Sequence, residues 1–135
     1  MEVKYNESTE LRPEGERIMD APLVSIDIPD FMEQLKKEPA WENGDRNAMT
    51  VYKTNGMRIV LIALHKDAEL KRHTAEGIIS VQVLEGKISF ATDDKSVELD
   101  KGGMIALHKG LHHSVKAIKE SVFLLTISNS EGKQS

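Results

Sequence analysis

Short stretches with strand character, separated by turns, fill residues 49–128, and this pattern constrains the fold more than any other feature of the chain. The stretches are rich in β-branched and other apolar residues, which favour strands. Asparagine, aspartate and glycine stand between them, for example at Asn55 and Gly56. These residues accept the backbone angles of tight turns. About nine or ten short strands with no long helix among them predict an all-β sandwich or barrel.

The N-terminal part of the chain, residues 1–48, has a different pattern. Residues 1–20 are rich in charged side chains and predict an arm that is ordered only where another element holds it. The alternating segment 23–28 predicts a strand. Asp30 is placed to cap a short helix that ends before Pro39.

The chain of 135 residues is long enough for one domain with its own core. We expect the barrel to span residues 49–128, with residues 1–48 packed against it and a polar tail at 129–135. Cysteine is absent, so disulfides and thiolate metal sites are excluded. The start of the chain is polar, and no apolar run approaches the ~20 residues of a membrane-spanning helix. These features predict a soluble, cytoplasmic protein with no membrane partner.

Charge argues against a nucleic-acid partner. The net charge is −4, and acidic and basic residues are mixed along the chain. The most basic stretch, residues 66–72, also contains Asp67 and Glu69. A nucleic-acid-binding domain usually carries a basic patch instead.

The segment 58–65 is the most apolar of the expected strands, and it is apolar on both faces. Both faces therefore need cover. The barrel core covers one face. The other cover is expected to be a second subunit in a homodimer, or residues 21–38 of the same chain.

Two segments combine histidine and glycine at spacings that resemble the two motifs of the cupin superfamily. The first begins at His73 and closes on Gly86, and the second runs from Gly102 through Gly110 to His113. In cupins the first motif carries two histidines, a glutamate and a closing glycine, and the second carries glycines, a proline and a histidine. The resemblance is closest to small single-domain cupins with a degenerate first motif. It implies a conserved β-barrel of the RmlC-like jelly-roll type.

The resemblance also implies roles for individual residues. His73 matches the first histidine of the first motif, and His113 matches the histidine of the second. Ala75 stands where the family has its second histidine, and Ile79 stands where it has its glutamate. Two of the four usual metal ligands are thus replaced by apolar residues. The resemblance implies a ligand pocket lined by His73, His113, Ala75 and Ile79.

A divalent transition metal such as iron, manganese, nickel or zinc usually takes three or four donors. His73 and His113 are the ligands that the resemblance retains. His65, at the end of the apolar strand, and His108, at the proline position of the second motif, are weaker candidates to complete the set. Gln82 has the wrong strand parity to be a good replacement. We therefore expect a small-molecule pocket around the histidine pair, with or without a metal.

Three functions are compatible with such a site. The first is a small-molecule-binding protein, in which each neutral imidazole donates one hydrogen bond and accepts another. The second is a metal-dependent cupin enzyme, such as a dioxygenase or an isomerase, which the further histidines would support. The third is a non-catalytic structural or interaction protein whose pocket is filled by side chains. No carboxylate is evident beside the histidines, so the sequence favours binding over catalysis and names no substrate.

Overall fold

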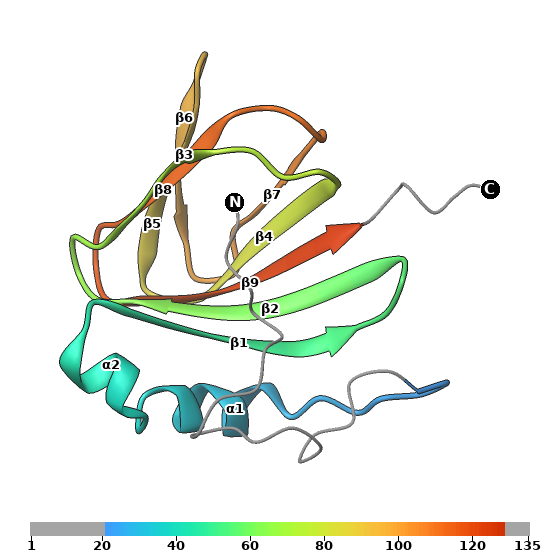
Figure 1. Cartoon of the computed structure of the whole chain (residues 1–135). Helices are drawn as coiled ribbons and strands as arrows, with labels where there is room; N and C mark the ends of the chain where they lie inside the picture. Colours follow the sequence, from blue (N-terminus) through green and yellow to red (C-terminus); the bar gives the residue numbers. More distant parts are fainter. Residues whose placement is uncertain (1–20, 129–135) are drawn as a thin grey trace.

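The computed structural model describes residues 21–128, so the arm predicted for residues 1–20 and the tail predicted for 129–135 lie outside the described residues. Within the described part, two antiparallel sheets face each other, and two short helices lie outside them (Figure 1). One sheet has the strand order β1-β2-β9-β4-β7 and the other β3-β8-β5-β6. The strands are β1 (Arg46–Lys53), β2 (Met57–Leu64), β3 (Glu69–His73), β4 (Ile78–Glu85), β5 (Lys87–Thr92), β6 (Ser96–Asp100), β7 (Met104–Leu107), β8 (His113–Ala117) and β9 (Ser121–Ser128). The predicted all-β, two-sheet fold is confirmed.

A turn at Gly86 carries the chain from β4 in one sheet to β5 in the other. Gly86 has φ of +88°, and a Cβ atom there would lie 2.2 Å from the carbonyl oxygen of Glu120. Only glycine fits both conditions. The Ser121 hydroxyl fastens the same corner, because its Oγ accepts a hydrogen bond from the Lys87 N–H at 2.9 Å and donates to the Lys119 carbonyl at 2.7 Å. The turn therefore holds the two sheets together where they meet.

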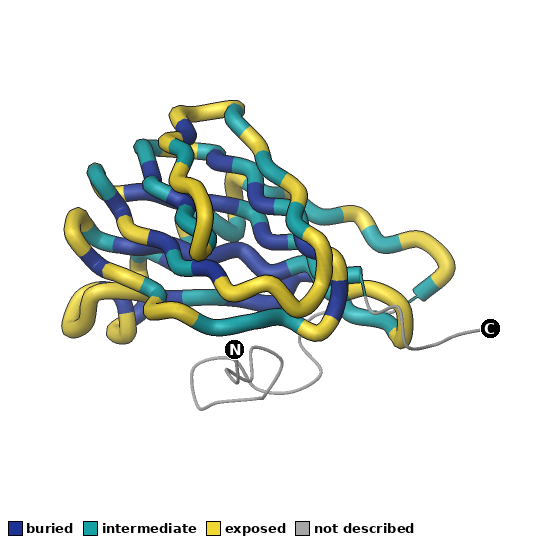
Figure 2. The backbone as a smooth tube through the Cα atoms, turned by 90° about the horizontal axis from the view of Figure 1, so that it is seen from above, coloured by how far each residue is buried: buried dark blue, intermediate teal, exposed yellow. Residues whose placement is uncertain are grey.

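Alternating side chains from both sheets build the core. In β4, Ile79, Val81 and Val83 are buried, and the residues between them are partly exposed. Phe90 of β5 and Phe123 of β9 fill the space between the sheets. Figure 2 shows the same alternation along the strands, with the exposed positions concentrated in the turns. The core thus occupies the inside of the barrel, as the period-two pattern predicts.

The helices α1 (Ile28–Leu35) and α2 (Pro39–Asn43) lie against the outer face of the five-stranded sheet (Figure 1). Leu35 and Trp41 form a second apolar cluster there with Leu61 of β2. The Asn47 amide joins α1 to β1, because its Nδ2 donates to the Leu35 carbonyl at 3.0 Å. The chain itself therefore covers the second apolar face of β2, which was one of the two predicted alternatives. The apolar outer face of β2 therefore no longer supports a homodimer, which stays a prediction.

The start of α1 corrects two sequence predictions. The strand predicted for residues 23–28 is wrong, because Ile26 packs in the helical cluster and no strand forms there. The helix is capped by Asp27 and not by Asp30, since the Asp27 carboxylate accepts the Asp30 N–H at 3.1 Å. Pro39 opens α2, where its fixed φ suits the first helical position.

Two strand assignments also differ from the prediction. Strand β1 begins at Arg46, a few residues before the barrel boundary expected at residue 49. The edge strand β3 was missed, because most of its residues are charged or polar and exposed. No helix within residues 21–128 is long and apolar enough to cross a membrane.

Candidate functional site

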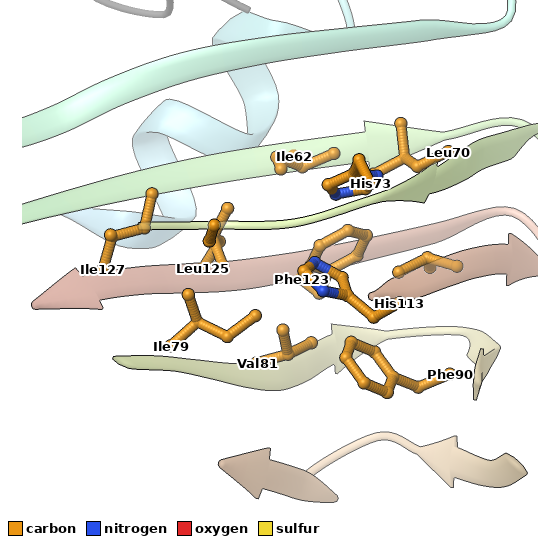
Figure 3. Close-up of a pocket in the computed structure, with 12 residues that line it drawn as sticks. Ile62, Leu70, His73, Ile79, Val81, Phe90, His113, Phe123, Leu125 and Ile127 are labelled. Carbon is orange, nitrogen blue, oxygen red and sulfur yellow. The ribbon is translucent and has the colours of Figure 1, made fainter. Parts of the chain in front are cut away.

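A cavity lies between the two sheets, beside the end of β3 and the start of β8 (Figure 3). Its volume is about 20 Å³, which is room for one or two water molecules. Besides His73 and His113, its walls are apolar side chains from both sheets and one loop: Ile62, Leu70, Ala75, Ile79, Val81, Phe90, Val115, Phe123, Leu125 and Ile127. All four residues that the family resemblance places in a pocket line this cavity.

The two histidines come from paired strands. His73 is the last residue of β3, His113 is the first residue of β8, and their Cα atoms are register partners. Their ring centroids are 4.3 Å apart and the rings meet edge to face at 65°. The His113 ring also stacks on Phe90, with centroids 5.4 Å apart and planes 12° apart. These contacts fix both imidazoles against the cavity (Figure 3).

Each imidazole is oriented by a hydrogen bond to the main chain two residues earlier. The Nδ1 atom of His113 lies 3.1 Å from the Leu111 carbonyl oxygen. The Nδ1 atom of His73 is hydrogen-bonded in the same way to the Lys71 carbonyl. A carbonyl oxygen only accepts, so in each neutral ring Nδ1 carries the proton and Nε2 keeps a lone pair. Neither Nε2 atom has a hydrogen-bond partner among residues 21–128.

His113 is held in its neutral form. The residue is only 5% exposed. Burial lowers the pKa of His113, the neighbouring His73 and His112 add to that effect, and the hydrogen bond to Leu111 opposes it. A neutral imidazole with Nδ1 protonated is an acceptor at Nε2. The cavity therefore presents acceptor nitrogen atoms in apolar surroundings.

The positions that differ from the cupin motif are apolar in the structure as well. Ile79 is 3% exposed and packs in the barrel core, and Ala75 packs against that core from the loop after β3. Both line the cavity. A carboxylate or imidazole at either position would face the histidine pair, so the replacements remove donors from the site itself.

The weaker metal-ligand candidates do not reach the histidine pair. His65 stacks on Trp41 with ring centroids 3.4 Å apart, and its Nε2 lies 2.9 Å from the Trp41 carbonyl oxygen. It packs there because β2 ends beside α2. His108 is exposed on the connection between β7 and β8, and Gln82 is not among the residues that line the cavity.

The metal that the family resemblance implies does not fit this donor set. Such ions usually collect three or four nitrogen and oxygen donors. The described residues contain no group of three histidine, aspartate or glutamate side chains placed to hold a metal ion. The cavity offers two imidazoles and apolar walls.

Phe90 and Leu70 are cavity residues that sequence reasoning did not identify. For Phe90 a signal existed. It lies two residues after the buried Ile88 in β5, and residues two apart in a strand face the same side, here the inside of the barrel. Leu70 lies in the missed edge strand β3. Its inward direction becomes visible only from its pairing with Val115.

Two facing antiparallel sheets that enclose an apolar cavity with a histidine pair define a barrel of the jelly-roll class. Comparison with known structures identifies it as the cupin fold. A conserved protein of unknown function from Streptococcus pyogenes is 20% identical over 87% of this chain and 95% of its own, with a TM-score of 0.64. A cupin superfamily protein from Desulfitobacterium hafniense is 13% identical over 63% and 78%, with a TM-score of 0.61. An RmlC-like cupin from Desulfovibrio desulfuricans is 21% identical over 84% and 98%, with a TM-score of 0.59.

These likenesses establish the fold and assign no activity. No family model matches the sequence, and no curated protein matches it.

Proposed function

We propose that this protein binds a small, mainly apolar molecule in the barrel, and that His73 and His113 recognise a hydroxyl or N–H group on it. One observation carries the proposal. Both Nδ1 atoms are bonded to main-chain carbonyls, which leaves both Nε2 lone pairs beside an apolar cavity. A hydrogen-bond donor on the ligand would satisfy them.

The surroundings support binding more than catalysis. Ligand pockets are typically apolar with a few fixed polar groups that set orientation, and this cavity has that composition. General base catalysis by the pair would create an imidazolium in this apolar cavity, and the lining contains no carboxylate to stabilise that charge. The small volume implies that only a hydroxyl-sized group enters beside the imidazoles. The apolar side chains along β9 must move apart for the body of the ligand to lie between the sheets.

A non-catalytic structural role is the second candidate, and the volume of about 20 Å³ favours it. In that case the side chains would fill the barrel and leave space only for water. The two candidates differ in whether an added small molecule displaces that water.

The test is a titration with two isomers, 1-hexanol and methyl pentyl ether, followed by NMR of the Val81 and Ile127 methyl groups. The alcohol can donate a hydrogen bond and the ether cannot. We expect 1-hexanol to bind about tenfold more tightly, since a lost hydrogen bond at a buried acceptor costs roughly 1–3 kcal/mol. His73→Phe and His113→Phe should each reduce this preference.

His65→Gln is the matched control, because it removes a histidine outside the cavity and should leave both affinities unchanged. Equal affinities for the two isomers would overturn the role of the histidines. Absence of binding by either isomer would favour the structural candidate.

A further inference from the structure

A row of residues crosses the five-stranded sheet at the end where the cavity lies. Arg58 of β2 is the register partner of Ile127, and Ile127 is the register partner of Ile79 in β4. Both isoleucines line the cavity. Directly opposed residues in antiparallel strands place their side chains on the same face. Arg58 therefore lies on the cavity face, one strand away from the cavity wall.

A second cation continues this row. Lys53 of β1 is the register partner of Arg58. Like charges directly opposite each other destabilise a sheet, and both residues are half-buried. Neither side chain forms an ion pair with another residue in the range 21–128. Glu76, on the loop after β3, is exposed and pairs with neither cation.

The chain path places these cations beyond the histidine pair. Strand β3 stops at His73, and the chain then runs along a loop to reach β4 at Ile78. Figure 1 shows this end of the five-stranded sheet, with the β1–β2 hairpin and the end of β9, extending past the four-stranded sheet. In β9, Phe123, Leu125 and Ile127 all line the cavity. Four residues of strand span about 13 Å, so this wall has the length of an extended ligand, which enters when the side chains facing the wall move apart.

We propose that the ligand of this cavity carries an anionic group, a carboxylate in the simplest case, that binds between Arg58 and Lys53. This inference rests on the proposed function and adds a chemical class to it. The ligand has a hydroxyl or N–H group at the histidine end, an apolar chain along β9, and a carboxylate at the outer end. A guanidinium binds a carboxylate with two parallel hydrogen bonds, and the lysine adds a second positive charge. The anion also relieves the repulsion between the two cations.

The test compares 6-hydroxyhexanoate with 1,6-hexanediol by isothermal titration and NMR at neutral pH. The two probes share the chain and the hydroxyl group, and only the first has a carboxylate. We expect the carboxylate probe to bind about tenfold more tightly, as hydrogen bonds to charged groups permit. Arg58→Met should abolish this preference without changing the affinity for the diol. Added salt should also reduce the preference.

Lys116→Met is the control, because it removes an exposed cation on the four-stranded sheet. It should leave the preference unchanged. Equal binding of both probes to the wild-type protein, or wild-type binding of 6-hydroxyhexanoate by Arg58→Met, would overturn this inference. The proposed function would stand in that case if His113→Phe still weakened both probes. Binding of neither probe would overturn both.

Discussion

His65 and His113 lie beside two different apolar clusters within residues 21–128, and their environments differ. His65 lies in the helical cover outside the five-stranded sheet, where its Nε2 lies 2.9 Å from a carbonyl oxygen and its Nδ1 lies 3.9 Å from Glu120 Oε1. His113 lies inside the barrel, where Nδ1 has a partner and Nε2 has none within residues 21–128. The His65 ring stacks on Trp41 and so stabilises the packing of the helical cover. A histidine with a free lone pair beside a cavity is available to a ligand.

The apolar clusters beside these two histidines also differ, because only the barrel cluster surrounds the cavity described above. The helical cluster is built from fully buried residues such as Leu35, Met49 and Leu61. The barrel cluster surrounds the cavity, and among the cavity-lining residues in the range 21–128 only the two histidines have polar side chains. The helical cover therefore stabilises the barrel, and the barrel interior carries the candidate site.

The largest expected effect tests the first half of this comparison. Leu35 in α1 is fully buried, so Leu35→Ala should lower the free energy of unfolding by about 2–5 kcal/mol. Denaturant unfolding measures this loss. The affinity for 1-hexanol should stay unchanged under conditions where the variant is folded. Leu23→Ala is the control, because Leu23 is 87% exposed and its removal should cost little. Loss of binding in folded Leu35→Ala would show that the two regions are coupled.

An intermediate effect is expected when the missing metal ligands are restored. Ala75→His together with Ile79→Glu would place two donors in the cavity that already contains His73 and His113. Nickel or zinc should then raise the stability of the double variant by about 2.7 kcal/mol at a free concentration 100 times its dissociation constant. Thermal unfolding with and without metal measures the shift.

The wild-type protein and each single variant are the controls for this restoration and should respond less to the metal. Without metal, the double variant should be less stable than the wild type, because Ile79→Glu buries a carboxylate at a position only 3% exposed. A wild-type response as large as that of the double variant would show that two imidazoles suffice, and would contradict our interpretation of the donor set.

The smallest expected effect is a change in stability with pH. Burial lowers the pKa of His113 from its ordinary 6.5. Between the lowered pKa and 6.5 the unfolded chain binds more protons than the folded one, so stability rises with pH in that window. The contribution of neutral His113 to the free energy of unfolding is fully present above pH 6.5, and it declines as the pH falls toward the lowered pKa. The affinity for 1-hexanol should fall with it, because a protonated imidazole has no acceptor nitrogen.

Denaturant unfolding at several pH values between 5 and 7 measures this slope, and His113→Phe should flatten it. Val115→Ala is the control, because it weakens the same core without removing a titrating group. An unchanged slope in His113→Phe would mean that His113 is not kept neutral by burial.

The sequence alone predicted the barrel and much of its candidate site. Alternation and turn residues are local signals, and strands β2 to β9 all lie within the predicted barrel range of residues 49–128. The family resemblance brought His73, His113, Ala75 and Ile79 together, and all four line one cavity. The N-terminal segment was harder to predict. A short apolar run such as residues 23–28 suits a strand or a covering segment equally well, and the choice depends on what it packs against.

Only the tertiary structure decided which histidines face the cavity and which of their nitrogen atoms have no hydrogen-bond partner within residues 21–128. His65 appeared in the sequence as a candidate ligand, and it stacks on Trp41 because β2 ends beside α2. The cationic pair of Lys53 and Arg58 likewise emerged from strand register. Apart from the missed strand β3, the sequence determined which side chains face inward along a strand, since that depends on local period. Which inward side chains meet across strands depends on long-range pairing, and this pairing set the chemistry of the cavity.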